Sequence, residues 1–146
     1  MSFFDAIDLA ASGLTAERTR MDVTSENLAN AQTTQGANGQ PYRRQEVVLQ
    51  QVGGGFSTQL AGALGSSGAT PGGVEVAGIV NDPTPDQLVY DPGHPGANAQ
   101  GYVRMPNVNP VTEMTDLISE SNSYQADVTA MSTAKTMYSK TLDLLK

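Results

Sequence analysis

Residues 110–146 read PVTEMTDLISESNSYQADVTAMSTAKTMYSKTLDLLK and contain no glycine, and no proline after Pro110. Apolar or aromatic side chains recur at alternating steps of three and four, which predicts one long helix with a heptad seam. At ~1.5 Å per residue this helix is roughly 50 Å long, more than a domain of this size needs to cover its own core. We expect the packing positions of this seam to be Met114, Leu117, Tyr124, Val128, Met131, Tyr138, Leu142 and Leu145, with Ser121 and Lys135 as polar interruptions.

The start of this helix is well marked. Asn109 can cap it, and Pro110 suits the first helical position because a proline lacks the N–H that would be unpaired there. Glu113 and Asp116 follow where the helix dipole favours negative charge. The sequence therefore predicts a helix beginning at Pro110.

A matching pattern lies at the N-terminus, where a helix is predicted over residues 2–30. Its seam positions are Phe4, Ile7, Leu14, Met21 and Leu28, in a register completed by Ala11, Arg18 and Ser25. A lighter stripe of Leu9, Ala16 and Val23 runs beside this seam, so the helix has more than one apolar edge. We expect the two terminal helices to pair as a coiled-coil-like hairpin that leaves further apolar edges for other subunits.

The segment between the helices predicts a small β element. Short strands are expected within residues 41–52, 74–80, 87–90 and 102–105, separated by turns rich in proline and glycine. Residues 53–73 hold eight glycines in twenty-one positions, which is typical of a flexible loop. The predicted fold is thus mostly α with a small β insertion: a terminal helical domain of residues 1–31 plus 110–146, and a β-rich insertion of residues 32–109.

The composition of the chain excludes several classes of function. Fifteen acidic residues against eight basic ones give a net charge of −7, and no basic stripe is present that could neutralise a nucleic acid. We expect no cleavable signal peptide and no membrane-spanning segment. Because eleven of the residues in 111–146 are Ser or Thr, the last helix is weak by itself, and we expect the termini to order on assembly.

Catalytic and ligand-binding sites are not predicted. The chain has one histidine, His94, in a Pro/Gly turn, and no cysteine, so we expect no metal, no cofactor and no enzymatic activity. The acidic residues of both helices are expected to be solvated. Arg43 and Arg44 point to opposite sides of a strand, and one is expected to pair with an acidic group of a neighbouring subunit.

Four segments carry a family resemblance. They are SENLAN at 25–30, GQPYRR at 39–44, GYVRMPNV at 101–108 and SYQA at 123–126. The first resembles the S-x-N-L-A-N signature of bacterial flagellar axial proteins. Together, in this order, the four resemble the proximal rod proteins of the FlgC family, over nearly the whole chain except residues 53–73.

This resemblance implies a structural subunit of the flagellar basal-body rod. It implies export by the flagellar type III system, polymerisation through the terminal helices, and transmission of torque across the periplasm. The implied partners are copies of the chain, other rod proteins, the ring/rod adaptor and the export gate, without nucleic acid and without membrane insertion. The motif residues Asn27, Leu28, Ala29 and Asn30 would lie at the turn out of the first helix, and Phe3 with Ile7 matches an export signal.

Two other interpretations stay open. Within the family, the chain can be another axial subunit, although distal rod and hook proteins usually carry a longer insertion. From a different class, it can be a cytoplasmic coiled-coil adaptor, which would be a stable small oligomer when purified. An enzyme is a distant third.

Overall fold

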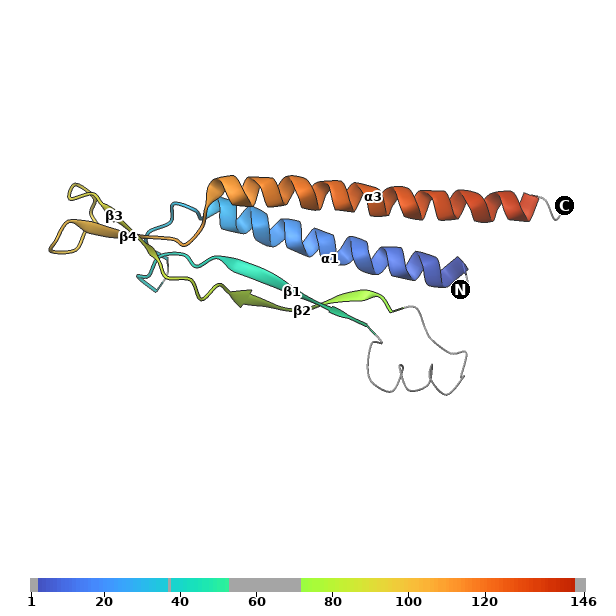
Figure 1. Ribbon diagram of the computed structural model, residues 1–146, viewed down its shortest axis with the longest axis horizontal. Helices are drawn as coiled ribbons and strands as arrows, with labels where there is room; N and C mark the ends of the chain where they lie inside the picture. Colours follow the sequence, from blue (N-terminus) through green and yellow to red (C-terminus); the bar gives the residue numbers. More distant parts are fainter. Residues whose placement is uncertain (1–2, 37, 53–71, 144–146) are drawn as a thin grey trace. The chain divides into compact units, whose positions relative to one another are not determined.

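The computed structural model describes residues 3–36, 38–52 and 72–143, without the side chains of 3–6. Within these residues, one long helix comes before four short strands in the sequence and a second long helix comes after them (Figure 1). The elements are α1 (Phe3–Ala29), β1 (Gln45–Gln51), β2 (Val74–Asn81), β3 (Gln87–Tyr90), β4 (Tyr102–Met105) and α3 (Pro110–Asp143). The prediction of a mostly α protein with a small β part is confirmed.

The start of α3 is capped as the sequence predicts. The backbone N–H of Val111 donates to Asn109 Oδ1 at 3.0 Å, which pairs one of the free donors of the first turn. Pro110 occupies the first helical position. None of the described helices has the length and hydrophobicity of a membrane-crossing segment.

The chain forms two compact units, and both helices contribute to each. The first unit comprises Met1–Thr19, Val48–Gly78 and Glu120–Lys146, and the second comprises Arg20–Val47 and Ile79–Ser119. The two domains expected from the sequence separate the helices from the strands, whereas these two units group residues that contact one another. The expected division stays a prediction.

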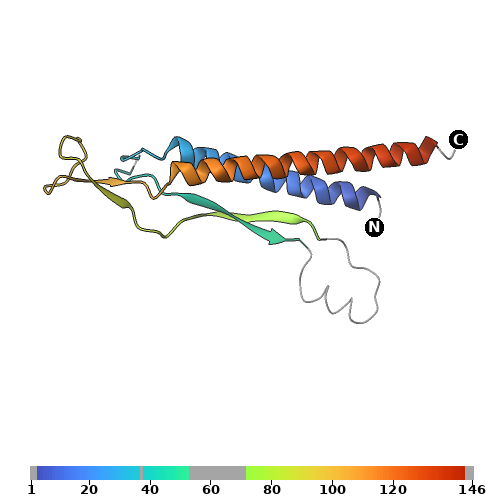
Figure 2. The ribbon, with the colours of Figure 1, turned by 45° about the horizontal axis from the view of Figure 1, so that its top comes forward.

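The second unit contains the β3–β4 hairpin (Figure 2). The strands are antiparallel, with Gln87 opposite Met105 and Tyr90 opposite Tyr102. The two tyrosine rings meet edge to face at 5.3 Å. Gly101 has φ +82°, and a Cβ there would lie 2.8 Å from the Tyr90 ring, so both backbone and space require glycine. On the buried side, Val103 joins Val23, Pro106 and Val108 in the small core of this unit.

The first unit brings α1 close to α3 at Gly13. A Cβ on Gly13 would lie 2.9 Å from Asp127 Oδ2, so the absence of a side chain allows this approach. Nearby, Ser12 Oγ accepts a hydrogen bond from Val74 N at 3.2 Å, which ties α1 to the start of β2. Ala16 is the buried apolar residue of this part of α1.

Threonine hydroxyls along α3 are paired within the helix. Each of five threonines donates to the carbonyl oxygen four residues before it, at 2.8–2.9 Å: Thr115, Thr129, Thr133, Thr136 and Thr141. Such bonds satisfy the hydroxyl without any partner outside the helix.

The close approach at Gly13 generates a prediction. Ala is more favourable than Gly inside a helix by about 1 kcal/mol, but its Cβ would press on the Asp127 carboxylate. We expect Gly13→Ala to raise the free energy of unfolding by less than this amount in the parent chain, and by the full amount when Asp127→Ala is also present. Chemical denaturation followed by circular dichroism measures both gains, and equal gains in the two backgrounds would contradict the close approach.

Candidate functional site

The Asn27 side chain is the centre of a polar network in the second unit. It is 1% exposed, in the last turns of α1. Its Nδ2 donates to Gln45 O at 2.8 Å and to Glu113 Oε2 at 3.1 Å. Its Oδ1 accepts from Gln45 N and from the Tyr42 hydroxyl, both at 2.9 Å. All four hydrogen-bonding positions of the amide are therefore used.

The contact with Gln45 resembles a step of a β-ladder. Asn27 pairs with both the N–H and the C=O of Gln45, as the backbone of a neighbouring strand would. Gln45 is the first residue of β1. The side chain thus fixes where β1 begins relative to the end of α1.

Glu113 brings α3 into the network. Its carboxylate is 1% exposed and accepts from Arg44 Nε at 2.6 Å as well as from Asn27. A buried carboxylate is costly unless it is paired and hydrogen-bonded, and here both oxygens have partners. The expectation that the acidic residues of the helices are solvated is therefore wrong for Glu113. It is also wrong for Glu120, which is 4% exposed.

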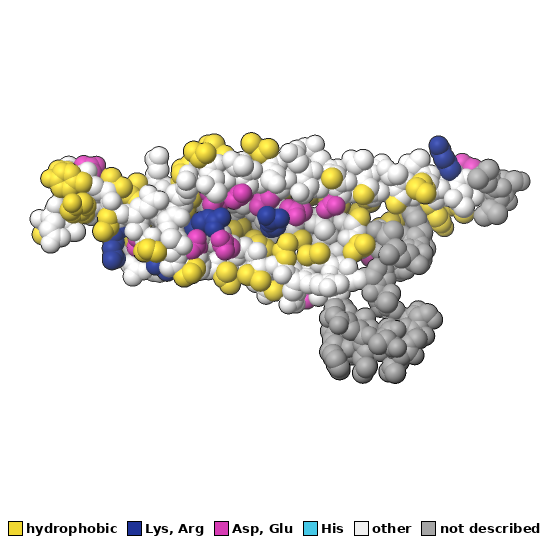
Figure 3. Space-filling view, in the orientation of Figure 1, with side chains coloured by type: hydrophobic (Ala, Val, Ile, Leu, Met, Phe, Trp, Pro, Cys, Tyr) yellow, Lys and Arg dark blue, Asp and Glu magenta, His cyan; other side chains and the backbone are white. Residues whose placement is uncertain are grey.

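Arg44 connects the network to further acidic groups. Besides Glu113 it pairs with Glu46, with Asp82 Oδ2 at 3.6 Å and with Asp116 Oδ2 at 3.8 Å. Figure 3 shows basic and acidic side chains meeting on one face between the start of α3 and the strands. These carboxylates all belong to the same chain, so this arginine already has its partners without a neighbouring subunit.

The backbone at Arg44 is fixed as well. Its N–H donates to Asn107 Oδ1 at 2.8 Å, and its carbonyl accepts from Asp82 N at 2.8 Å. Asn107 also donates to Thr84 O at 3.2 Å. The loop before α3 and the turn after β2 are thereby held to the start of β1.

The charged groups gathered in the network shift the pKa values of several of its residues. Burial, then the negative charges of Glu26 and Glu113, raises the pKa of Tyr42 to about 12. Burial alone would lower the pKa of Arg44, but its hydrogen bond to Glu113 and the negative charges of Glu113 and Glu46 raise it. Hydrogen bonds from Thr84, and then the charge of Arg44, hold the pKa of Asp82 below its usual value. Tyr42 is thus neutral and Arg44 charged.

Three of the four segments that carry the resemblance meet in this network. Asn27 comes from 25–30, Tyr42 and Arg44 from 39–44, and Asn107 from 101–108. The buried role of Glu113 could not be inferred from the sequence, because an acid in the first turn of a helix is equally expected from the helix dipole. With its amide and carboxylate saturated, the network can hold α1, β1 and α3 in one geometry, and its groups are not free for a substrate.

The other motif residues lie as follows. Asn30 Nδ2 donates at 2.9 Å to Glu26 O, which also accepts the backbone N–H of Asn30 at 3.0 Å, so the side chain adds a second bond to this carbonyl. Asn27 reaches the strand and α3 instead. Leu28 is half-buried and Ala29 is exposed.

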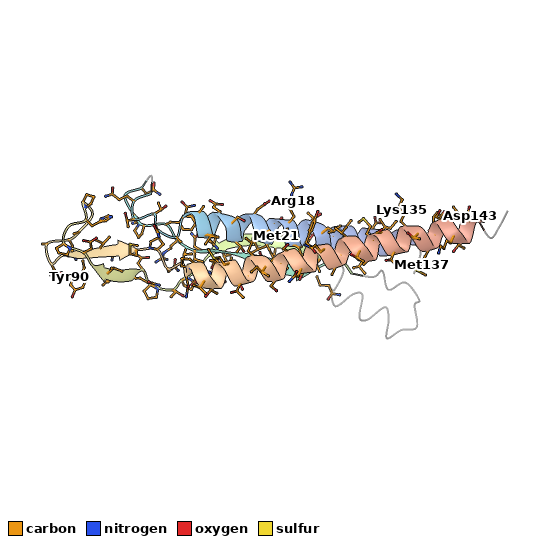
Figure 4. All side chains as sticks on the ribbon, turned by 90° about the horizontal axis from the view of Figure 1, so that it is seen from above. Arg18, Met21, Tyr90, Lys135, Met137 and Asp143 are labelled. Atoms are coloured by element: carbon orange, nitrogen blue, oxygen red, sulfur yellow. The ribbon has the colours of Figure 1, made fainter. Side chains whose placement is uncertain are left out.

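The predicted seam positions of α3 divide into two sets. Three are half-buried: Leu117, Tyr124 and Met131. Four are exposed: Met114, Val128, Tyr138 and Leu142. Figure 4 shows Lys135, in the predicted seam, and Met137, outside it, on opposite sides of α3. That these residues pack against other subunits stays a prediction.

In α1 two residues of the lighter stripe are more buried than the seam, whereas the third, Leu9, is exposed. Ala16 and Val23 are buried, whereas the seam positions Ile7, Leu14, Met21 and Leu28 are half-buried.

Phe3 and Phe4 lie outside the described side chains, and Leu145 lies outside the described residues. His94 is a turn residue whose Nδ1 accepts from Gly96 N at 3.0 Å.

Comparisons with known proteins agree on one family. Residues 7–38 match the family described as flagella basal body rod protein, and residues 99–144 match the family described as flagellar basal body rod FlgEFG protein C-terminal. The chain is 48% identical over 150 residues to the flagellar basal-body rod protein FlgC of Bacillus subtilis, with 100% of each chain covered. It is 42% identical over 144 residues to FlgC of Salmonella typhimurium, with 99% of this chain and 98% of the relative covered.

Removing the Asn27 amide should destabilise the chain strongly. In Asn27→Ala the backbone of Gln45, the Tyr42 hydroxyl and Glu113 all lose a buried partner, so we expect the free energy of unfolding to fall by about 3 kcal/mol. Asn30→Ala is the matched control, since it removes an exposed hydrogen bond to Glu26 O and a part-buried one from the Thr33 hydroxyl, and should cost about 1.5 kcal/mol. Urea denaturation of the two variants measures this difference, and similar losses would show that Asn27 is not central.

The Tyr42 hydroxyl should lose its proton at a higher pH than an ordinary tyrosine. Its folded pKa of about 12 lies above the ordinary value of 10.0, so the stabilisation by its neutral phenol is complete below pH ~10. This contribution is lost as the pH rises through about 12. We expect a phenolate absorbance step near pH 12 that is missing from Tyr42→Phe, and superimposable titrations of the two chains would refute the assignment.

Proposed function

Because the chain belongs to the FlgC family of flagellar basal-body rod proteins and is a structural subunit of the basal body, we propose that α1 and α3 polymerise into the rod. The single observation that carries this proposal is the row of exposed large apolar side chains along α3. It includes Val111, Met114, Ile118, Val128, Tyr138 and Leu142. Apolar surface of this extent is typical of an interaction site.

We further propose that α1 and α3 pair as an antiparallel, coiled-coil-like hairpin. Two contacts support this proposal: Gly13 approaches Asp127, and Asn27 bonds Glu113. From 13 to 27 α1 advances by 14 residues, and from 127 to 113 α3 goes back by 14, which is two heptads in each helix. Equal steps in opposite directions are what an antiparallel heptad pair requires.

The partners proposed for these surfaces are copies of the chain and other rod proteins. The ring/rod adaptor and the type III export gate are proposed as further partners, the latter through Phe3 and Ile7. Export requires an extended chain, and two features suit it: a cysteine-free sequence, and an α3 rich in Ser and Thr, which is weak without its neighbours. The chain then orders as it joins the rod beyond the cytoplasm.

Torque would pass through many helix contacts instead of one site. Within each subunit, the Asn27 network links α1 and α3 to β1 by buried hydrogen bonds, so a load on the helices reaches the strands without a flexible joint. The mechanism is therefore mechanical, and its essential property is the stiffness of contacts within and between subunits.

Leu142→Asp tests the role of the exposed row. A carboxylate cannot be buried in an apolar interface, so we expect this subunit to be exported normally but to fail to build a functional rod. Thr141→Asp is the matched control, because it adds the same charge at an exposed neighbouring position outside the predicted seam. Swimming motility and the exported fraction are measured in a flagellated host that lacks its own copy of the subunit.

Full motility with Leu142→Asp would refute assembly through this row of side chains. A failure of export in Leu142→Asp but not in Thr141→Asp would show that the row acts before assembly. Equal loss of motility in both variants would mean that added charge, and not the seam, is responsible.

A further inference from the structure

Two arginines of the second unit lie outside the Asn27 network. Arg43 and Arg104 line the same groove, which has a volume of about 640 Å³. The side chain of Arg43 is 48% exposed, and its nearest carboxylate, Asp86 Oδ1, is 4.0 Å away, beyond hydrogen-bond distance. Arg104 is exposed and forms no ion pair with any residue that the structure describes. Figure 3 shows basic side chains close to the β3–β4 hairpin.

The groove continues into a smaller hollow of about 200 Å³. Gln40, Pro41 and Arg104 line both, and the hollow adds the apolar side chains of Leu88 and Tyr102. Arginine and tyrosine on a partly apolar surface are the residue types enriched in protein interfaces. Asp86 offsets one of the two positive charges, so the groove keeps an excess positive charge in a chain whose net charge is −7.

The same unit also carries an unpaired acidic surface. Asp22 and Glu26 are both exposed and lie one helical turn apart on α1, so their carboxylates share a face of the helix. Neither forms an ion pair with a residue in the described part of the chain. Like charges at this spacing destabilise an isolated helix, and a cationic partner would relieve that repulsion.

We propose that the Asp22–Glu26 face of one subunit docks in the Arg43–Arg104 groove of a second copy. The occupant follows from charge complementarity: the residues that line the groove carry a net positive charge, and this helix face supplies two carboxylates that can pair with the two guanidinium groups. The surfaces differ from each other, so the contact is heterologous and repeats head to tail from copy to copy. The inference rests on the proposed function, because it specifies one contact of the polymer.

Charge reversal with mutual rescue tests this docking. The full-length double variants Arg43→Glu/Arg104→Glu and Asp22→Lys/Glu26→Lys should each assemble at least tenfold less than the parent chain, because like charges then face each other at every contact. Mixed in equal amounts, they should regain assembly, since each variant keeps the intact surface that the other needs. Sedimentation velocity at low salt measures the assembled fraction, and circular dichroism checks that each variant keeps its helix content.

Cross-linking provides a second readout that does not depend on charge. The chain has no cysteine, so Asp22→Cys in one sample and Arg43→Cys in another introduce single thiols. Under mild oxidation we expect the mixture to form the mixed disulfide dimer in preference to either symmetric dimer. Glu75→Cys, exposed on β2, replaces Asp22→Cys as the control and should not cross-link to Arg43→Cys.

The outcomes separate this inference from the proposed function. If the parent chain assembles and both the reversed variants and the cross-linking pair behave like their controls, the docking contact is wrong while polymerisation stands. If the parent chain does not assemble, alone or with other rod subunits, the proposed function fails and this inference fails with it. Recovery only in the mixture, together with the mixed disulfide, supports the contact.

Discussion

The structure depends on keeping one buried carboxylate satisfied. Glu113 lies in the interior of the second unit, and an unpaired charge there would destabilise the fold by several kcal/mol. Arg44 and Asn27 supply its hydrogen bonds, and both must be held in place to do so. Arg44 comes from the segment before β1, and Asn27 comes from the end of α1. The burial of Glu113 at the start of α3 therefore determines how these three parts of the chain are placed against one another.

Much of the fold could be predicted from local sequence. Asn109 and Pro110 marked the start of α3, and the turn residues around 87–90 and 102–105 bounded β3 and β4 at the residues observed. These features depend on neighbours within a few positions. The network does not: Asn27 and Glu113 are 86 residues apart, and only the folded chain shows that an acid suited to a helix start is also a buried partner.

The faces of the helices were harder to predict for a different reason. Each helix has two apolar edges, and periodicity cannot tell which edge faces the same chain and which faces a neighbour. In α1 the smaller residues of the lighter stripe, Ala16 and Val23, are buried because small side chains allow close packing within the subunit, whereas Leu9 of the same stripe is exposed. In α3 large side chains such as Met114 and Leu142 are exposed, and it is these that we propose to pack against other subunits.

The threonines of α3 give the helix a surface unlike that of the Asn27 network. Their hydroxyls bond to carbonyl oxygens of the same helix, as at Thr129 and Thr133, so they need no partner from another chain. Where copies pack along these threonines, as we propose, the hydroxyls do not set the register between them. The alignment of neighbouring copies is then left to shape and charge, whereas Asn27 and Glu113 fix the alignment inside one subunit by a buried hydrogen bond.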